Sequence, residues 1–261
     1  MEIFKAVALQ FSVEEGNLEA NIQKVDLLGA HLESIEPKIV VLPEMWASGF
    51  DYKRLPEIAS RASYVLEWMF RWSIKWNAVL VGSTAEKSKN GIVNRAYIID
   101  PQSGIVGTYD KVHLFSPHGE HLHFTRGSLL PVVQTSICRI GVVICYDIRF
   151  PEICRLVALK GAEFLCVPAL WPQARVSHWR ILLRARAIEN QLFVVGCNGC
   201  GKIGNMVYPG ASAIIDPWGE VLAEGGSDEE ILITTINLPT IEDVRSRIPC
   251  FQDRIDPAKL G

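Results

Sequence analysis

Three short strings that each occur twice, in the same order, constrain the fold of this chain more than any other feature. The second copy of each string follows the first by 114 to 125 positions. In the clearest pair, an apolar stretch ends in Pro, two further residues and Trp. The pairs are residues 39–46 with 164–171, 79–82 with 193–196, and 98–101 with 214–217. Because order and spacing agree, we interpret the chain as two similar halves with a junction near residues 125–138.

Strand and helix patterns alternate in both halves. Each half reads as strand, helix, strand, helix, strand and hairpin, and the first strands are expected at residues 6–11 and 141–146. Helices are expected at residues 17–34, 63–77, 151–160 and 177–191. Pro151 at a first helical position and Gly161 just beyond a last one are typical helix ends, and Ser177 is a candidate N-cap. One face of the last helix carries an apolar stripe, formed by Ile181, Leu182, Ala185 and Ile188. These patterns predict an α/β fold in which two sheets, each with helices on one face, pack as a layered sandwich.

The composition is that of an ordinary globular chain of 261 residues, of which 49% are hydrophobic. Its 26 basic and 29 acidic residues give a formal net charge of −3, so neither nucleic acid nor a membrane surface is an expected partner. No stretch approaches the roughly 18 apolar residues of a membrane span, and the first residues lack the build of a signal peptide. The seven cysteines are odd in number, and several stand in apolar runs (Cys138, Cys154 and Cys166). Free thiols fit a reducing compartment, and we expect one domain, residues 1–261, in the cytoplasm.

Three side chains stand where strands end, which is where α/β folds expose reactive groups on a rigid scaffold. Cys145 follows an apolar strand and precedes a helix start, a setting in which a helix N-terminus and a nearby cation can stabilise a thiolate. Glu44 follows another apolar strand, where burial raises a carboxyl pKa toward that of a general base. Lys111 leaves a strand into an apolar segment, where its ammonium can stabilise an oxyanion. The alternatives are a buried structural cysteine, a glutamate that caps a helix or forms a surface ion pair, and a solvated lysine.

With their neighbours, these residues resemble the three signature segments of the nitrilase, or carbon–nitrogen hydrolase, superfamily. The segments are residues 42–45, 109–115 and 145–152, which carry Glu, Lys and Cys in that order. The resemblance continues through residues 171–172, 184–191 and 210–212, so it covers nearly the whole chain. It implies a four-layer αββα sandwich, which agrees with the duplicated pattern.

The same resemblance implies roles for individual residues. Glu44 is implied as the general base, Lys111 as the stabiliser of the tetrahedral intermediate and Cys145 as the nucleophile. The backbone N–H of Tyr146 joins Lys111 in holding the oxyanion, and Glu120, in the loop after the lysine, has a positioning role. The implied reaction is attack of the thiol on a carbonyl carbon, loss of ammonia and hydrolysis of a thioester. It requires no metal and no organic cofactor.

Two further groups of residues allow a different interpretation. Residues 118–123 contain three His and one Glu, donors that a zinc-dependent hydrolase would use. Their spacing differs from the helical His-Glu-x-x-His motif, so a polar loop at the active site is the favoured interpretation. The pair Cys197 and Cys200 lacks the two further ligands of a structural zinc site, and we interpret it as packing or loop residues.

Within the superfamily, the chain most resembles the ω-amidase branch, whose members hydrolyse the terminal amide of 2-oxoglutaramate or 2-oxosuccinamate. Such a substrate carries a carboxylate at its far end, so the pocket requires a cation. Arg175 is the first choice for a bidentate contact, and Arg149 is the second because it can instead hold the turn at Cys145. Trp171 and His178 are the other candidates for contact with the substrate.

Other functions and the assembly state follow from the same resemblance. An amidase for deaminated glutathione shares the catalytic residues and is the closest alternative. A nitrilase proper is disfavoured because Tyr146 and Asp147 stand where its usual cysteine context has Trp-Glu, and the intact Glu, Lys and Cys argue against a non-catalytic binding protein. Family members assemble through the helices beside the active site and through the C-terminal tail. Residues 240–261 contain the apolar segment 248–251, so we expect this tail to dock on a partner subunit of a homodimer.

Overall fold

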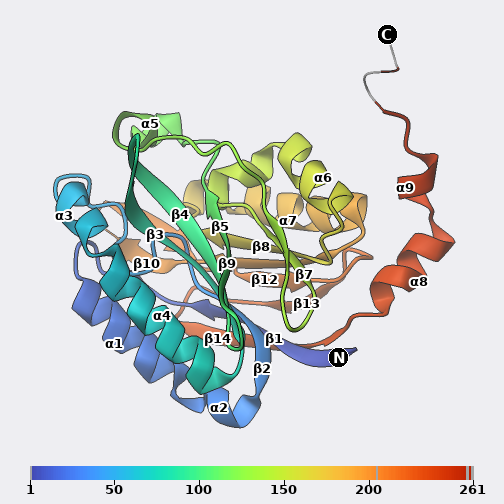
Figure 1. Ribbon diagram of the computed structural model, residues 1–261, viewed down its shortest axis with the longest axis horizontal. Helices are drawn as coiled ribbons and strands as arrows, with labels where there is room; N and C mark the ends of the chain where they lie inside the picture. The colour runs from blue at the N-terminus through green and yellow to red at the C-terminus, as the bar shows by residue number, and fades with distance from the viewer. Residues whose placement is uncertain (1, 204, 257–258, 260–261) are drawn as a thin grey trace.

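Two six-stranded sheets packed face to face form the centre of the molecule, and helices cover their outer faces (Figure 1). The computed structural model describes residues 2–203, 205–256 and 259. Residues of β1, β2 and β3 contact β8 and β9 across the interface between the sheets. The arrangement of helix, sheet, sheet and helix confirms the predicted αββα sandwich.

The first sheet has the strand order β14-β1-β2-β3-β4-β5. Its strands are β14 (Glu230–Asn237), β1 (Ile3–Gln10), β2 (Pro37–Val41), β3 (Val79–Ser88), β4 (Gly91–Asp100) and β5 (Gly104–Asp110). Strands β1, β2 and β3 are parallel, whereas β4 and β14 run antiparallel to their neighbours. Because β5 is antiparallel to β4, it runs in the direction of β2 and β3 and ends at the same edge of the sheet.

The second sheet repeats this plan in the order β13-β12-β9-β8-β7-β6. Its strands are β13 (Val221–Glu224), β12 (Ala213–Ile215), β9 (Phe193–Asn198), β8 (Phe164–Ala169), β7 (Arg139–Val142) and β6 (Val132–Gln134). The repeated strings fall on equivalent strands, β2 with β8, β3 with β9, and β4 with β12, so the duplicated topology is confirmed.

The two sheets do not coincide with the two halves of the sequence, because each needs an antiparallel edge strand beside its first parallel strand. In the second sheet β6 fills that place next to β7, and in the first sheet β14, from the end of the chain, fills it next to β1. The chain also forms a hairpin that the strand pattern did not predict, β10 (Cys200–Ile203) with β11 (Met206–Pro209). This hairpin contributes to one wall of the cavity described below.

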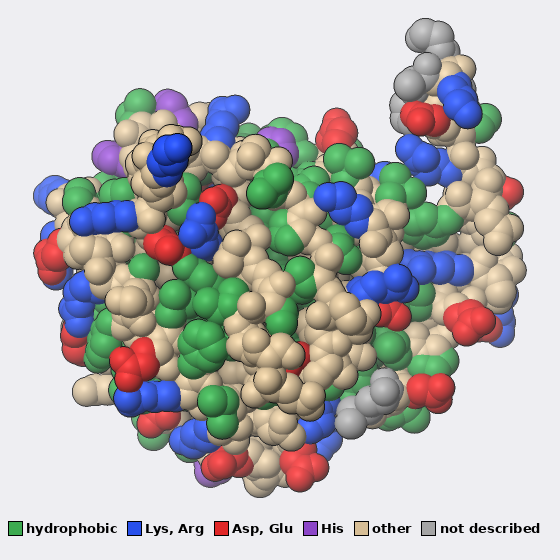
Figure 2. Space-filling view, in the orientation of Figure 1, with side chains coloured by type: hydrophobic (Ala, Val, Ile, Leu, Met, Phe, Trp, Pro, Cys, Tyr) green, Lys and Arg blue, Asp and Glu red, His purple; other side chains and the backbone are tan. Residues whose placement is uncertain are grey.

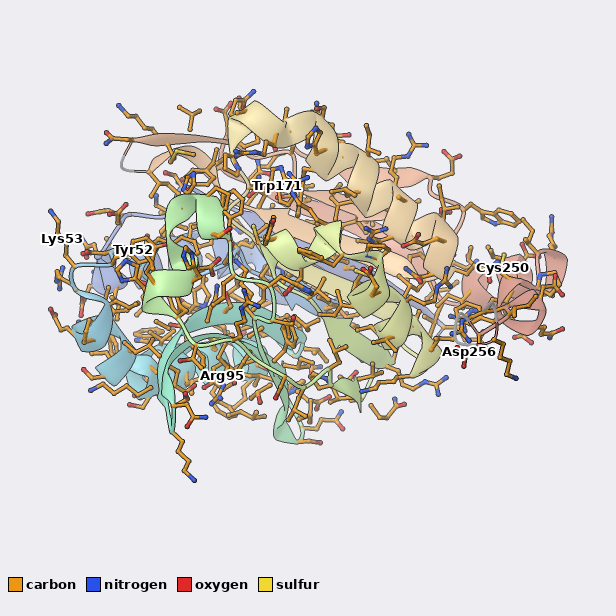
Figure 3. The ribbon with its side chains drawn as sticks, turned by 90° about the horizontal axis from the view of Figure 1, so that it is seen from above. Tyr52, Lys53, Arg95, Trp171, Cys250 and Asp256 are labelled. Carbon is orange, nitrogen blue, oxygen red and sulfur yellow. The ribbon has the colours of Figure 1, made fainter. Side chains whose placement is uncertain are left out.

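Helices cover one face of each sheet, as predicted, and Figure 3 shows the two helical layers on opposite sides of the molecule. The first layer contains α1 (Leu18–Leu28), η1 (Gly29–His31), α2 (Leu32–Ile35), α3 (Leu55–Ser60) and α4 (Ala62–Trp76). The second contains η3 (Cys145–Arg149), α6 (Pro151–Leu159), η4 (Gln173–Arg175) and α7 (Val176–Asn190). Short elements η2 (Ser116–His118) and α5 (Glu120–His123) lie in the loop after β5. The helix predicted at residues 17–34 is interrupted by η1 at Gly29, whose missing side chain admits the ring of Trp76.

Helix α7 differs from its prediction in two respects. Arg175 occupies its N-cap position without a side-chain capping hydrogen bond, and Ser177 lies inside its first turn. The predicted apolar stripe points outward, since Ile181 is 66% and Ile188 is 51% exposed. The buried face instead includes Arg186, whose Nε donates to the carbonyl of Ile148 at 2.9 Å. A buried guanidinium with hydrogen-bond partners is tolerated in the interior. The prediction of the inner face from apolar residues alone was therefore wrong.

Alternation along the strands divides the buried side chains between two cores. In β1, Ala6 and Ala8 face the other sheet, whereas Val7 and Leu9 face the helices of the first layer. This period of two is the expected consequence of strand geometry. Small residues on the inner face of β1 let the sheets approach, and the parallel strands end at one edge of the sandwich.

The C-terminal segment packs against the edge of the sandwich, since Ile241 and Val244 are buried and Nε2 of Gln191 donates to the carbonyl of Ile248 at 2.7 Å. Helices α8 (Thr240–Arg247) and α9 (Cys250–Asp253) extend from the body beside α6 (Figure 1). Basic and acidic side chains are interspersed over the face shown in Figure 2, without a broad area of one sign. No helix of the described residues has the length and apolar character needed to cross a membrane.

Candidate active site

Loops from both sheets meet at the edge where the parallel strands end. Glu44 lies just after β2, Lys111 just after β5 and Cys145 just after β7. The backbone N–H of Glu44 donates to the carbonyl of Ala169, at the end of β8, at 3.3 Å. The first two residues belong to the first half of the chain and Cys145 to the second, so packing of the two sheets brings the three predicted residues together.

The ammonium of Lys111 is buried between two carboxylates. Its Nζ lies 2.7 Å from Oε1 of Glu44 and 2.8 Å from Oε2 of Glu120. All three residues are 1% exposed. The loop after β5 also holds Glu120 in place, since the backbone N–H of Phe115 donates to its Oε2 at 2.6 Å. A buried charge requires such partners, and the predicted alternatives of a solvated lysine and a surface glutamate are wrong for these positions.

Asn94 and Leu170 complete the coordination of Glu44. The side-chain amide of Asn94 donates to Glu44 Oε1 at 2.8 Å, and the backbone N–H of Leu170 donates to its Oε2 at 3.1 Å. Sequence reasoning missed Asn94, which lies in β4. The alternation of side chains along the strand could have indicated it, because Asn94 lies on the same inward face as Ala96 and Ile98.

Cys145 occupies a strained turn at the start of η3. Its φ of +45° lies in the left-handed region, which non-glycine residues rarely adopt. The side chain is buried, and its Sγ lies 3.8 Å from the carbonyl oxygen of Leu170. The next residue, Tyr146, lies in the first turn of η3, where backbone N–H groups have no partner within the helix. Cys145 and Tyr146 both line the cavity described below.

The electrostatics of the site differ from the expected stabilised thiolate. Burial raises the pKa of Cys145 well above its usual value, the Glu44 carboxylate raises it further, and Lys111 only partly opposes this. Burial also raises the pKa of Glu44, against the lowering effect of Lys111. For Lys111, burial acts to lower the pKa, but the two carboxylates outweigh it and hold the pKa above its usual range. These directions favour a protonated thiol at Cys145 beside a carboxyl group of raised pKa.

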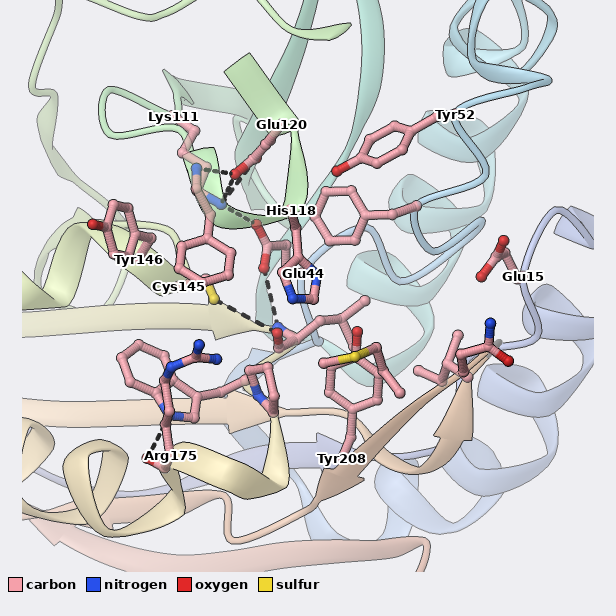
Figure 4. A pocket seen from close by; sticks show the side chains of 18 of the residues that line it. Glu15, Glu44, Tyr52, Lys111, His118, Glu120, Cys145, Tyr146, Arg175 and Tyr208 are labelled. Atoms are coloured by element: carbon pink, nitrogen blue, oxygen red, sulfur yellow. Dashed lines mark hydrogen bonds and ion pairs between the residues drawn. The ribbon is translucent and has the colours of Figure 1, made fainter. Parts of the chain in front are cut away.

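A cavity of about 180 Å³ opens above these groups (Figure 4). The predicted residues that line it are Glu44, Lys111, Glu120, Cys145, Tyr146, Arg149, Trp171 and Arg175. The structure does not bring His178 to the cavity wall, but its Nδ1 lies 3.3 Å from Nη1 of Arg149. The guanidinium of Arg149 stacks over Trp171 and that of Arg175 over Phe115, and neither forms an ion pair with a carboxylate of the described chain.

The cavity is asymmetric in charge. Arg175 lies at one end of it and Glu15 at the other (Figure 4). Burial lowers the pKa of Arg149, and the neighbouring charge of Arg175 adds to this effect. Two guanidinium groups thus share one end of the cavity, which favours a ligand whose anionic group points that way.

Aromatic side chains that the sequence analysis did not single out form the opposite wall. Phe50, Tyr52 and Tyr208 line the cavity, together with Met206 of β11. They lie on loops and on the unpredicted hairpin, so they could not be predicted from the positions of strand ends.

Residues of the loop 118–123 are directed toward different neighbours. His123 stacks on the ring of Tyr52 with ring centroids 4.2 Å apart, His118 packs against Phe115, and Glu120 is directed to Lys111. Among the residues that the structure describes, no three His, Cys, Asp or Glu side chains are grouped to hold a metal ion. Cys197 and Cys200 are both buried and free, and the thiol of Cys197 donates to the carbonyl of Leu9 at 3.3 Å.

Comparison with known proteins agrees with this geometry. A carbon–nitrogen hydrolase family model matches residues 5–246. The chain is 39% identical over 247 residues to a 2-oxoglutaramate amidase of Bacillus subtilis, covering 94% of this chain and 95% of that one. It is 37% identical to the omega-amidase YafV of Yersinia enterocolitica over 256 residues, covering 97% of each chain. The solved structure of XC1258 from Xanthomonas campestris, a CN-hydrolase superfamily protein with an arsenic adduct in its active site, superposes with a TM-score of 0.90 at 31% identity and covers 98% of both chains.

The two packed sheets, with a carboxyl, an ammonium and a thiol gathered at the strand ends, define a hydrolase built on an αββα sandwich. The chain belongs to the carbon–nitrogen hydrolase family, as the match over residues 5–246 shows.

Replacement of Lys111 by Met tests the buried charge cluster. The variant keeps the volume of the side chain but leaves Glu44 and Glu120 without their cation, so we expect a loss of about 3–5 kcal/mol in the free energy of unfolding near pH 8. The pKa of Glu44, already raised by burial, rises further in the folded variant, so the folded state binds a proton more tightly than the unfolded state. The loss therefore grows as pH rises through that pKa and is smaller near pH 5.

Urea unfolding at both pH values measures the effect. Lys75→Met is the matched control, because Lys75 and Asp26 form an exposed pair at 3.5 Å whose removal changes stability by less than about 1 kcal/mol. An equal loss at the two pH values for Lys111→Met would contradict the account.

Proposed function

We propose that this chain is an ω-amidase, which hydrolyses the terminal amide of a small 2-oxo dicarboxylic acid monoamide such as 2-oxoglutaramate or 2-oxosuccinamate. The observation that carries the proposal is the cavity itself, with Cys145 and the Glu44–Lys111–Glu120 cluster at its base and two guanidinium groups at one end. The names of the relatives, a 2-oxoglutaramate amidase and an omega-amidase, support the same substrate class.

In the first half of the proposed reaction, Cys145 is the nucleophile and Glu44 the general base. Sγ attacks the amide carbon while its proton passes to Glu44, whose raised pKa suits it to accept and return a proton near neutral pH. The carbonyl oxygen becomes an oxyanion, which Lys111 and the backbone N–H of Tyr146 stabilise. Glu44 then returns the proton to the nitrogen, the C–N bond breaks, and ammonia leaves a thioester on Cys145.

In the second half, water takes the place of ammonia. Glu44 accepts a proton from the water as the water oxygen attacks the thioester carbon. The C–S bond then breaks, and Glu44 returns the proton to the departing sulfur, which gives the carboxylic acid and the free thiol. Glu120 holds the ammonium of Lys111 through both of its carboxylate oxygens, so its proposed role is to position Lys111. The proposed mechanism needs no metal and no organic cofactor.

Arg175 is proposed to bind the distant carboxylate of the substrate. Its backbone carbonyl accepts a hydrogen bond from Nε1 of Trp171 at 2.7 Å, which anchors the segment that carries it. Arg149 lies between Trp171 and His178 and is proposed to provide a second positive charge, with His178 acting only through its contact with Arg149. The small cavity favours a compact substrate over the longer deaminated glutathione, since sites for drug-sized ligands are typically about 300–1,000 Å³.

Ammonia release from a panel of substrates tests the proposed activity. We expect 2-oxoglutaramate and 2-oxosuccinamate to be hydrolysed with the highest kcat/KM, and deaminated glutathione and a simple nitrile to be poor substrates. Cys145→Ala should reduce turnover by at least about 10³-fold with the fold intact. Preference for deaminated glutathione would replace the proposed substrate class, and turnover by the Cys145→Ala variant would exclude the thiol mechanism.

Arg175→Gln separates carboxylate recognition from catalysis. Loss of a charge-assisted pair of about 1.5–3 kcal/mol should raise KM for 2-oxoglutaramate by about 10- to 100-fold, while kcat/KM for a neutral amide of similar length changes little. Arg180→Gln is the control, because Arg180 lies on the same segment but pairs with Glu224 outside the cavity. Equal effects of Arg175→Gln on the anionic and neutral amides would contradict the assignment.

We further propose that the enzyme is a cytoplasmic homodimer. All seven cysteines are free thiols, which supports a reducing compartment. The outward apolar residues of α7 and α6, among them Ile181, Ile188 and Leu156, support a contact between subunits on that side. The segment α8–α9 lies beside these helices, with the guanidinium of Arg155 over the ring of Phe251, and this position supports docking of the tail on the partner.

A double substitution, Ile181→Glu with Ile188→Glu, tests this surface. We expect the variant to shift from dimer to monomer in sedimentation-velocity experiments, because the interface would have to bury two charges. Leu27→Glu with Ile74→Glu is the matched control, since these residues are 77% and 66% exposed on α1 and α4. An unchanged dimer in the first variant, or dissociation of the control, would place the interface elsewhere.

A further inference from the structure

Asp147 is a fully buried carboxylate that the proposed mechanism does not use. It lies in η3, two residues after Cys145, and has no exposed surface. Its two oxygens accept four hydrogen bonds, from groups on both sides of the junction between the halves of the chain. A buried carboxylate is stable only with such partners, so its presence here requires a structural or functional reason.

One set of hydrogen bonds reaches the segment that carries Lys111. The phenol of Tyr109 donates to Asp147 Oδ2 at 2.7 Å. The backbone N–H of His113 donates to Oδ1 at 2.9 Å, and the ring Nδ1 of His113 lies 2.8 Å from the same oxygen. Because Oδ1 can only accept, the ring nitrogen that faces it carries the proton. Lys111 stands between these two residues, so Asp147 holds the chain on either side of it.

The segment is also braced within itself. The backbone N–H of Val112 donates to the Tyr109 phenol at 3.2 Å, and the His113 ring stacks on Phe150 with centroids 3.6 Å apart. Tyr109 and His113 therefore transmit the position of Asp147 to the backbone of Lys111 from both directions.

The remaining hydrogen bonds of Asp147 close the turn at Cys145. The backbone N–H of Ile144 donates to Asp147 Oδ2 at 3.0 Å, and the backbone N–H of Asp147 donates to the carbonyl of Ile144 at 3.0 Å. These reciprocal contacts span Cys145, the residue with φ of +45°. A strained backbone conformation persists only where its surroundings hold it, and Asp147 supplies two of the contacts that do so.

We propose that Asp147 is a positioning residue, which sets the ammonium of Lys111 and the thiol of Cys145 in a fixed relation across the junction of the two sheets. The inference rests on the proposed roles of Lys111 and Cys145. Displacement of reacting groups by about 1 Å can cost about 10²-fold in rate, so a link of this kind affects kcat more than substrate binding. Tyr109 and His113 belong to the same link.

Asp147→Asn is the direct test, because it keeps the shape of the side chain and replaces one acceptor by a donor. The new NH₂ group then faces either the Tyr109 phenol and the Ile144 N–H or the two donors of His113. We expect kcat for the amide substrate to fall by about 30- to 100-fold, with KM within about twofold of the wild-type value. Alkylation of Cys145 by iodoacetamide, followed by peptide mass spectrometry, should slow by a similar factor, while alkylation of the exposed Cys250 in the same molecule stays unchanged.

A pair of isosteric variants at His113 separates the hydrogen bond from packing. Asn places an N–H donor near the position of Nδ1, whereas Leu has the same branching and no donor. His113→Asn should therefore retain kcat to within about threefold of wild type, and His113→Leu should lose about a further 3- to 10-fold, the worth of one hydrogen bond of about 0.5–1.5 kcal/mol. Tyr109→Phe removes the other link and serves if Asp147→Asn does not fold.

Three results would overturn the inference. Asp147→Asn or Tyr109→Phe could lower the unfolding temperature with kcat and Cys145 alkylation unchanged, which would make the link purely structural. A rise in KM at constant kcat would assign the effect to substrate binding. Equal losses in His113→Asn and His113→Leu would remove the hydrogen bond from the account. The alkylation measurements need no amide substrate, so they test the link even if the proposed substrate class is wrong.

Discussion

The rest of the site depends on the burial of one ammonium group. Lys111 is almost completely removed from water, and a charge in that position is costly unless opposite charges and hydrogen bonds replace the solvent. Glu44 and Glu120 provide both, and Asn94 and Leu170 hold Glu44 in place. Because these groups lie in β4 and in the segments that follow β2, β5 and β8, the cluster exists only when the strand ends are in register. The arrangement of the charged groups therefore requires the same packing of the strand ends that holds this edge of the sandwich together.

The same cluster disfavours a thiolate at Cys145, the proposed nucleophile. Two carboxylates around one ammonium already leave an excess of negative charge, and a thiolate in the same low-dielectric space would add to it. Burial is the main cause that raises the pKa of Cys145, and the charge of Glu44 adds to it, so in the proposed mechanism the proton leaves only as the new bond forms. Selectivity then falls to groups outside the cluster. The near-neutral surface does not steer an anion, so two placed guanidinium groups, Arg149 and Arg175, carry that proposed task.

Some features were predictable because their signal is local. Pro151 and Gly161 bracket α6 as predicted, and the repeated strings identified matching strands in the two sheets. Other features depend on distant partners and had no local signal. Polar Arg186 faces inward because the carbonyl of Ile148 accepts its hydrogen bond, whereas apolar Ile181 faces outward on the same helix. Asn94 reads as an ordinary strand residue until β4 is placed beside Glu44.

The sequence by itself determined the duplicated α/β plan and placed Glu44, Lys111 and Cys145 at strand ends, because strand periodicity and helix boundaries are written in neighbouring residues. Only the tertiary structure decided how these groups affect one another. The pKa of each depends on burial and on charges distant in the chain, and hydrogen bonds of the Asp147 carboxylate join the Lys111 and Cys145 segments. Burial and long-range contact are properties of the packed sheets, which no local pattern contains.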